Sequence, residues 1–268
     1  MQEYTKSIVR IIEKLFQARQ NMSMNSLLIF IVTAPARKLK FLLNSRAQNN
    51  VDSLVDRFTL IYHRNTWGSQ ESVSGPGSTI AMTESIRGLL PILFQKFQIS
   101  SILDVPCGDF NWMQLLELQG ISYIGGEIVK PLVSELNIKF SSDGIAFVQM
   151  DITNDAFPKS DLVLNRDCLF HLSYQDIYLT LSNFLDSGSK YFLSTSHDND
   201  QVFCNSNIKS GGFRRIDLFS TPFNFPKNFL FQIPELGEGS LPPRSLYLWD
   251  RDQVKVAYSS LKKFLSGL

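Results

Sequence analysis

The residues of this chain whose types and spacing could do chemistry are carboxylates that close apolar runs. Asp104, Glu127 and Asp151 each stand at or just before the end of such a run. Runs separated by room for one helix indicate buried parallel strands. Because the carboxyl ends of parallel strands face a shared ligand crevice, the three acids are expected to line one site.

The segment after the first run has an unusual charge for a ligand-binding loop. It reads Asp-Val-Pro-Cys-Gly-Asp-Phe-Asn-Trp-Met over residues 104–113 and carries two carboxylates. Loops that hold pyrophosphate rely on backbone N–H groups, and a carboxylate would repel the phosphates. This loop favours a ligand with a cationic amino group and no phosphate, such as S-adenosylmethionine (SAM). The candidate cofactor-binding residues of the loop are Asp104, Pro106, Cys107, Gly108 and Asp109.

The next two acids fit the remaining parts of such a ligand. Glu127 follows Asp104 at about the 20-residue spacing at which a second-strand acid accepts hydrogen bonds from ribose hydroxyls. Asp151, at the end of the third run, is placed to meet an adenine amino group. Their neighbours Ile128 and Ile152 join them as candidate cofactor-binding residues.

A polar cluster follows the fourth apolar run, 161–165. Arg166, Asp167 and His171 are expected nearest the reacting group, and Arg166 and Asp167 also border the cofactor. On a helical turn Asp167 and His171 would share a face, so that the aspartate could orient an imidazole acting as general base. The alternative is a histidine that only packs near the adenine. Arg166 would bind an anionic part of the acceptor, and Cys168 is expected to be apolar filler.

Two further candidates lie outside that cluster. His197 ends the fifth run and is a second candidate base; a metal held with Asp198 or Asp200 is the alternative. Trp67 precedes a Ser/Gly-rich loop, where it would cover the cofactor or form the acceptor wall. The alternative for Trp67 is a side chain that fills a gap in the core.

Three uncommon strings carry a family resemblance. They are W-G-S-x-E-S-x-S-G-x-G-S over 67–78, D-x-P-C-G-D-F-N-W-M over 104–113 and R-D-C-L-x-H-L over 166–172. The chain resembles class I SAM-dependent methyltransferases, and within them a poorly characterised group with these strings, over roughly residues 60–250. It departs from the usual D/E-x-G-x-G-x-G loop, because only Gly108 remains. Pro106 and Cys107 should make this loop stiffer.

The resemblance implies a fold and an activity. The fold is α/β: a Rossmann-like, seven-stranded, mostly parallel sheet with helices on both faces and an antiparallel edge strand, preceded by a helical N-terminal extension. The implied activity is methyl transfer from SAM to a hydroxyl group of a small molecule or glycan. The alternatives are a non-catalytic SAM-binding scaffold and a nucleotide-dependent oxidoreductase, which the missing G-x-G-x-x-G disfavours.

Composition narrows the class of protein. Lys and Arg total 26 against 25 Asp and Glu, a balance that disfavours a nucleic-acid partner. Three widely spaced cysteines indicate a reducing compartment, and we expect a cytoplasmic protein. With only three histidines and no C-x-x-C pair, no metal site is predicted. The longest N-terminal apolar stretch, 27–36, is too short to cross a membrane.

Two parts are predicted: a helical extension over 1–60 and a methyltransferase domain over 61–268. Residues 4–20 have the spacing of an amphipathic helix that would pack on the body of the protein, on a second copy to form a homodimer, or on a membrane surface. A further helix is expected after Thr83 as its cap. The other expected elements are helices over 110–118, 130–138 and 173–185 and late strands over 161–165, 191–196, 228–234 and 245–250.

Overall fold

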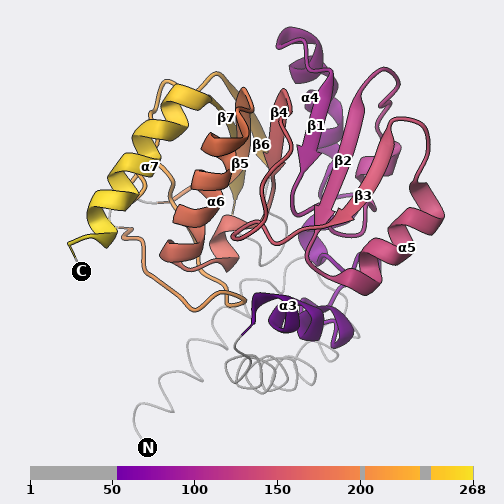
Figure 1. The fold of residues 1–268 in the computed structure, drawn as a ribbon, viewed down its shortest axis with the longest axis horizontal. Helices are drawn as coiled ribbons and strands as arrows, with labels where there is room; N and C mark the ends of the chain where they lie inside the picture. The colour runs from indigo at the N-terminus through magenta and orange to yellow at the C-terminus, as the bar shows by residue number, and fades with distance from the viewer. Residues whose placement is uncertain (1–52, 200–202, 236–242, 268) are drawn as a thin grey trace, which may run out of the picture. The chain divides into compact units, whose positions relative to one another are not determined.

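The protein is built on one seven-stranded sheet. The computed structural model describes residues 53–199, 203–235 and 243–267, which belong to one compact unit, Gln48–Leu268. The strand order is β3-β2-β1-β4-β5-β7-β6 (Figure 1). The strands are β1 Ser101–Asp104, β2 Ser122–Glu127, β3 Ile145–Gln149, β4 Leu162–Asn165, β5 Tyr191–His197, β6 Phe231–Glu235 and β7 Arg244–Asp250.

The pairing confirms the predicted fold class. Strands β1 to β5 run parallel, whereas β7 runs antiparallel to both β5 and β6. As a result, Arg244 at the start of β7 pairs with His197 at the end of β5 and with Glu235 at the end of β6. The reversed strand therefore brings an arginine to the edge of the sheet at which the parallel strands end.

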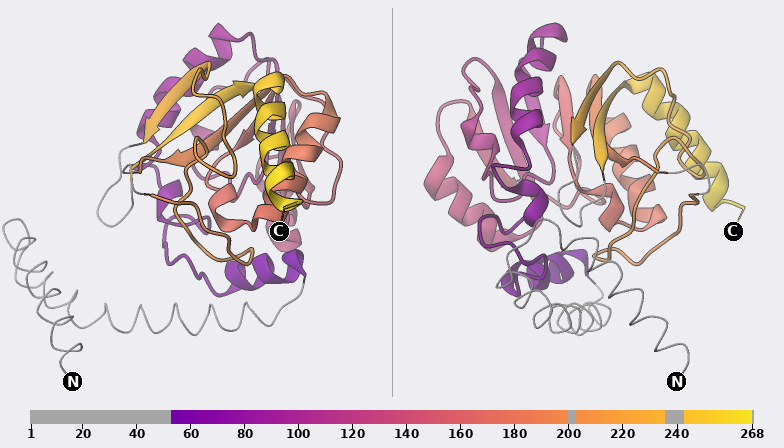
Figure 2. Two further views of the ribbon diagram at one scale, coloured as in Figure 1. Left: turned by 90° about the vertical axis from the view of Figure 1, so that its left-hand side faces the viewer. Right: turned by 180° about the vertical axis from the view of Figure 1, so that it is seen from behind.

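Helices cover both faces because strand side chains alternate between two apolar layers. Leu103, Val163 and Trp249 pack with α6 (Tyr174–Ser187) and α7 (Arg251–Leu265). Their neighbours in the strands pack with α4 (Glu84–Lys96) and α5 (Lys130–Phe140) on the other face. Figure 1 shows α6 and α7 side by side in front of the sheet, and the view from behind in Figure 2 shows α4 on the opposite face.

Two expected elements differ in the structure. The helix over 110–118 is wrong: only a short 3-10 turn, η2 (Met113–Leu115), forms there. Phe110 has a positive φ of 59°, and the chain turns back into β2 within a few residues, which leaves no room for further turns. Thr83 does stand at the N-cap of α4, but its hydroxyl donates to the Thr79 carbonyl instead of capping the helix.

Helix α3 (Leu54–His63) spans the predicted boundary at residue 60 and lies beyond the carboxyl ends of the strands (Figure 1). The Arg57 guanidinium donates to the Ser210 carbonyl, which ties α3 to the chain that follows β5. The predicted helix over 4–20 lies outside the described residues, so the extension and its dimer contact stay predictions. None of the helices in the described ranges is both long enough and apolar enough to span a bilayer.

Candidate active site

Asp104, the last residue of β1, is a buried carboxylate with one free oxygen. It is 3% exposed, and its Oδ2 accepts a hydrogen bond of 2.7 Å from the Tyr123 hydroxyl. Among the described residues no hydrogen-bond donor reaches its Oδ1. Burial raises the pKa of Asp104 to about 7, although the Tyr123 hydrogen bond and the charge of Arg166 lower it. A cationic group beside Oδ1 would stabilise the ionised form.

Glu127, the last residue of β2, faces the turn that follows β1. Its two carboxylate oxygens accept the backbone N–H groups of Gly108, at 3.2 Å, and Val129, at 3.1 Å. Burial raises the pKa of Glu127, and those N–H groups partly offset the effect. Each oxygen retains a lone pair, so the carboxylate can still accept hydroxyl donors. Pro106 and Cys107 form the turn that follows β1, and the Cys107 N–H donates to the Gly126 carbonyl at 2.9 Å.

Asp151 lies two residues past β3, whose last residue is Gln149, and is half-buried. Its Oδ1 accepts from the backbone N–H and the hydroxyl of Thr153, at 2.9 and 2.7 Å. Ile152 beside it is buried, and Ile128 after β2 is half-buried. Asp104 and Glu127 thus end β1 and β2, and Asp151 follows the adjacent β3, at one edge of the sheet.

Asp109, a candidate cofactor-binding residue, accepts hydrogen bonds from an earlier segment of the chain. Its carboxylate accepts from the Ser72 hydroxyl at 3.0 Å, the Val73 N–H at 2.8 Å and the Ser74 hydroxyl at 3.3 Å. These residues belong to a segment, Ser69–Ser78, that we call the strap. A Cβ at Gly108 would lie 2.1 Å from the Ser74 hydroxyl oxygen, so only glycine fits under the strap. Asp109 therefore fastens the strap to the loop.

Two other side chains hold the strap. Asn111 donates to the Glu71 carboxylate at 2.9 Å and to the Ser78 carbonyl at 3.0 Å. Arg166 donates to the Gly77 carbonyl at 2.7 Å and to the Ser78 hydroxyl at 3.4 Å. The loop after β1 and the end of β4 thereby fix the strap over the same sheet edge.

Arg166 belongs to a buried ion network that sequence reasoning missed. The network comprises Arg166, Asp167, Glu235 and Arg244. Arg166 contacts Glu235 at 2.5 Å and Asp167 at 3.5 Å, and Arg244 contacts Asp167 at 2.8 Å and Glu235 at 3.3 Å. Because Asp167 and Glu235 already pair with the Arg166 guanidinium, its charge is balanced without the anionic acceptor group that was expected to bind it. The signal in the sequence was Arg244, which begins β7, although no neighbouring residue in the sequence indicates its partner.

The expected hydrogen bond between Asp167 and His171 does not form. Asp167 has a positive φ of 51°, so the chain turns sharply before the 3-10 turn η3 (Leu169–His171), and the two side chains do not share a helical face. Instead, Asp167 accepts from the Thr195 hydroxyl at 3.2 Å and from Arg244. Burial raises the pKa of Asp167, but the charges of Arg166 and Arg244 outweigh it, and the carboxylate stays ionised.

His171 presents one ring nitrogen for chemistry. Its Nδ1 lies 2.7 Å from the Gly212 carbonyl, which can only accept, so Nδ1 carries the proton. In the neutral ring the lone pair is therefore on Nε2. Burial lowers the pKa of His171, which favours the neutral ring at pH 7. The rings of Trp67, at 5.3 Å, and Phe213, at 5.9 Å, flank the imidazole, so the predicted residues Trp67 and His171 do lie together.

His197, the other candidate base, has its lone pair already engaged. The Ile216 N–H donates to its Nδ1 at 3.2 Å, and the side chain is 4% exposed. Burial lowers the pKa of His197 to about 4, although the charge of Asp167 raises it. Protonating this ring would displace the hydrogen bond from Ile216. Of the two predicted bases, His171 has the geometry that accepts a proton.

The remaining candidates are the Cys168 thiol and the alternative metal site. Cys168 is 6% exposed, and burial raises the pKa of its thiol to about 12, as suits the predicted apolar filler. Within the described residues, no group of three or more His, Cys, Asp or Glu side chains is arranged to hold a metal ion. Asp200, one of the predicted ligands of an alternative metal site, lies outside the described residues.

Comparisons with known proteins show the fold. No family model matches the sequence, and no curated protein matches it significantly. The chain is similar in structure to 1,6-didemethyltoxoflavin-N1-methyltransferase of Burkholderia thailandensis, solved with 1,6-didemethyltoxoflavin and S-adenosylhomocysteine bound. The TM-score is 0.52 at 16% identity, over 74% of this chain and 86% of that one.

A second similar structure is human N-acetylserotonin methyltransferase in complex with SAM. Its TM-score is 0.50 at 14% identity, over 82% of this chain and 68% of that one. Both similar proteins are methyltransferases that were solved with SAM or its demethylated product. The likeness shows that this chain shares its overall fold with these methyltransferases.

Proposed function

We propose that this chain is a SAM-dependent methyltransferase that acts on a hydroxyl group. The observation that carries the proposal is the set of acids at the carboxyl ends of β1, β2 and β3, at the same edge of the sheet at which β4 leads into the neutral His171. Asp104 offers a free carboxylate oxygen to a cationic amino group, and Glu127 offers lone pairs to ribose hydroxyls. Asp151 is the candidate partner for the adenine amino group.

The residues present fit SAM, which carries an ammonium group and no phosphate. The buried Asp104 has no cation in direct contact with its Oδ1 among the described residues, and a bound ammonium would supply one. When bound, SAM supplies a methyl group on a sulfonium, which any well-placed nucleophile can displace. The chain's own residues must then position the acceptor and take its proton.

His171 is the proposed general base. Its Nε2 lone pair would receive the acceptor's hydroxyl proton, while Nδ1–H stays bonded to the Gly212 carbonyl. That carbonyl fills the orienting role that the sequence had given to Asp167. Asp167 instead completes the network around Arg244, and its negative charge favours the imidazolium at a distance.

The acceptor is expected to be uncharged. The guanidiniums of Arg166 and Arg244 are committed to carboxylates, and Arg214 donates to the Leu172 carbonyl. Rings of Trp67 and Phe213 beside the base suit a planar or hydroxylated small molecule. The site thus favours a neutral hydroxyl acceptor over a carboxylate or phosphate.

Calorimetric titration with SAM, and with NAD as the competing cofactor, tests the proposal. We expect SAM to bind and Glu127→Ala to weaken it by roughly 10–100-fold, as loss of a charge-assisted hydrogen bond predicts. Release of S-adenosylhomocysteine with a library of hydroxylated acceptors then separates an enzyme from a non-catalytic SAM-binding protein. Binding of NAD without SAM would contradict the proposal.

A further inference from the structure

The guanidinium of Arg214 is buried without a carboxylate to balance its charge. Arg214 is 6% exposed. Within the described ranges no Asp or Glu pairs with it, and its Nε has no hydrogen-bond partner. Burial lowers the pKa of Arg214 to about 10, although Tyr174 raises it, so the group is still a cation at pH 7. A buried cation without a counter-charge is destabilising, which indicates that this position uses the guanidinium itself.

That guanidinium joins the two ends of the 3-10 turn that carries His171. One terminal nitrogen of Arg214 donates to the Leu172 carbonyl at 2.5 Å, and the other reaches the Leu169 carbonyl at 3.5 Å. The two carbonyls stand on either side of His171 in the chain, at the start of η3 and just after its end. A forked guanidinium can bind both carbonyls at once, whereas the compact ammonium of a lysine cannot.

Backbone hydrogen bonds hold the same two segments together. The Arg214 N–H donates to the Phe170 carbonyl at 3.2 Å, and the Gly211 N–H donates to the His171 carbonyl at 2.8 Å. Gly212 lies between these two bonds, and its carbonyl is the group that meets Nδ1 of His171 at 2.7 Å. The segment that orients the imidazole is therefore attached to η3 on both sides of Gly212.

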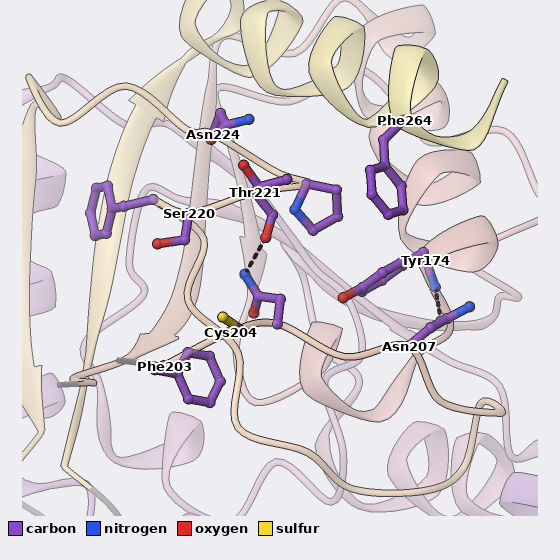
Figure 3. Close-up of a pocket in the computed structure, with 11 residues that line it drawn as sticks. Tyr174, Phe203, Cys204, Asn207, Ser220, Thr221, Asn224 and Phe264 are labelled. Carbon is purple, nitrogen blue, oxygen red and sulfur yellow. Dashed lines mark hydrogen bonds between the residues drawn. The ribbon is translucent and has the colours of Figure 1, made fainter. Parts of the chain in front are cut away.

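Arg214 is itself held by the first residue of α6. Its guanidinium carbon lies 5.3 Å from the centre of the Tyr174 ring, a cation–π contact. The Tyr174 ring meets the Phe223 ring edge to face, at 5.4 Å and 90°. The Tyr174 backbone N–H donates to the Asn207 amide oxygen at 2.8 Å, as Figure 3 shows. Because the ring is fixed on both counts, the guanidinium above it has one defined position.

We propose that Arg214 is the positioning residue of His171: it fixes η3 to the Gly211–Arg214 segment, so that Nδ1–H stays on the Gly212 carbonyl and the Nε2 lone pair stays free. The inference rests on the proposed function, in which that lone pair takes the acceptor's proton. The charge of Arg214 acts in the same direction. Burial and Arg214 lower the pKa of His171, whereas the Gly212 hydrogen bond and Asp167 raise it, so Arg214 helps to keep the ring neutral.

The test is ¹H–¹⁵N NMR of the histidine rings in the full chain, labelled with ¹⁵N and free of SAM and acceptor. The sequence has three histidines, and His63→Gln and His171→Gln identify two of their signals. We expect the neutral His171 ring of the wild type to carry its proton on Nδ1. Arg214→Lys keeps the charge but cannot span both carbonyls, so its ¹⁵N shifts should move toward the average of the two tautomers.

Arg214→Gln is the second variant, because it leaves no buried charge and should fold even if Arg214→Lys does not. It should show the same averaging, with a His171 pKa closer to 6.5 since the cation is gone. Arg87→Lys is the matched control. Arg87 also donates to a backbone carbonyl, that of Ile80 at 2.9 Å, and its Nε also lacks a partner among the described residues. It lies on α4, so its replacement should leave the His171 signals unchanged.

The proposal is overturned if the wild-type ring carries its proton on Nε2, or if Arg214→Lys and Arg214→Gln both keep the wild-type tautomer. Once turnover is measured, Arg214→Lys should lower kcat by roughly 10–100-fold and leave KM for SAM unchanged; a raised KM with normal kcat would also overturn it. The NMR experiment needs no cofactor. A chain that binds no SAM but shows the expected tautomers would therefore contradict the proposed function alone.

Discussion

Asp104 makes binding of a cationic cofactor depend on pH. Its pKa is raised to about 7 by burial, so below that pH the carboxyl must lose a proton before it can pair with an ammonium. We expect SAM affinity to rise up to about tenfold per pH unit from pH 5 to 7. Asp104→Asn should bind weakly at every pH in that window. Calorimetry across it is the measurement, and a flat wild-type profile would contradict the assignment.

The same group sets a stability trend in the ligand-free protein. The folded pKa of Asp104 lies above the unfolded value of 3.8. Its stabilising contribution is therefore complete below about pH 4 and is lost as pH rises through about 7. Asp104→Asn is neutral throughout, so its melting temperature should fall less than that of the wild type between pH 5 and 8. Thermal unfolding of both proteins in matched buffers tests the sign.

His171 and His197 differ in the hydrogen-bond partners of their ring nitrogen atoms. His171→Ala should retain SAM affinity and lose roughly 100-fold or more in turnover. Because burial lowers the pKa of His171 from its ordinary value of 6.5, the decline of the wild-type rate on the acid side, as the imidazole is protonated, should be centred below pH 6.5. Added imidazole should partly restore the variant, which loss of a merely structural side chain would not allow.

His197→Ala is the counterpart of that experiment. The His197 Nδ1 accepts the Ile216 N–H. Loss of the His197 side chain should therefore lower the free energy of unfolding more than the rate of methyl transfer. If only the His197 change slowed methyl transfer while SAM affinity stayed normal, the base would belong at the end of β5. Sequence spacing could not make this choice, because it shows neither the tautomer nor the partner of either ring.

At the scale of elements, the strap depends on one carboxylate. Asp109→Ala removes the acceptor for three donors of the strap. We expect amide hydrogen exchange at Val73 and Ser74 to increase by about tenfold or more, with a higher KM for SAM. Asp143→Ala is the control, since Asp143 is exposed in the turn before β3. Unchanged exchange in Asp109→Ala would show that Asn111 and Arg166 hold the strap without it.

The contrast between Asp104 and Asp109 shows what local patterns can predict. Asp104 ends an apolar run, and strand periodicity alone places it at the sheet edge. The partners of Asp109 are more than 30 residues earlier in the chain, in a loop without periodicity. Helix α7 could have been predicted, because Asp250 and Gln253 form a capping box ahead of the helical spacing of Val254, Ala257 and Leu261.

At the scale of the whole molecule, the sheet order follows from alternating strands and helices, whereas the ion network does not. Arg166 and Asp167 directly follow β4, but Glu235 and Arg244 reach them only because β7 is inserted between β5 and β6. The sequence distance between the two pairs conceals this contact. Charges brought together by topology are visible only once the strand order is known.

The buried ion network should make the stability of the whole molecule sensitive to a substitution that keeps the size and shape of the side chain. Glu235 is 2% exposed and lies between two guanidiniums. Glu235→Gln keeps the side chain's size but leaves a surplus positive charge buried, which costs about 3–5 kcal/mol of unfolding free energy. Because the network joins β4, β6, β7 and the strap, the loss should lower the urea midpoint of the whole unit.

Glu135→Gln gives the matched comparison. Glu135 pairs with Lys139 at 3.7 Å on the surface, with both side chains more than half exposed, so the same substitution there should cost at most about 1 kcal/mol. Equal urea midpoints for the two variants would mean that the buried network contributes no more than an exposed pair. A midpoint lowered only in Glu235→Gln, with an unchanged slope, would show that one carboxylate at the end of β6 stabilises the entire active edge of the sheet.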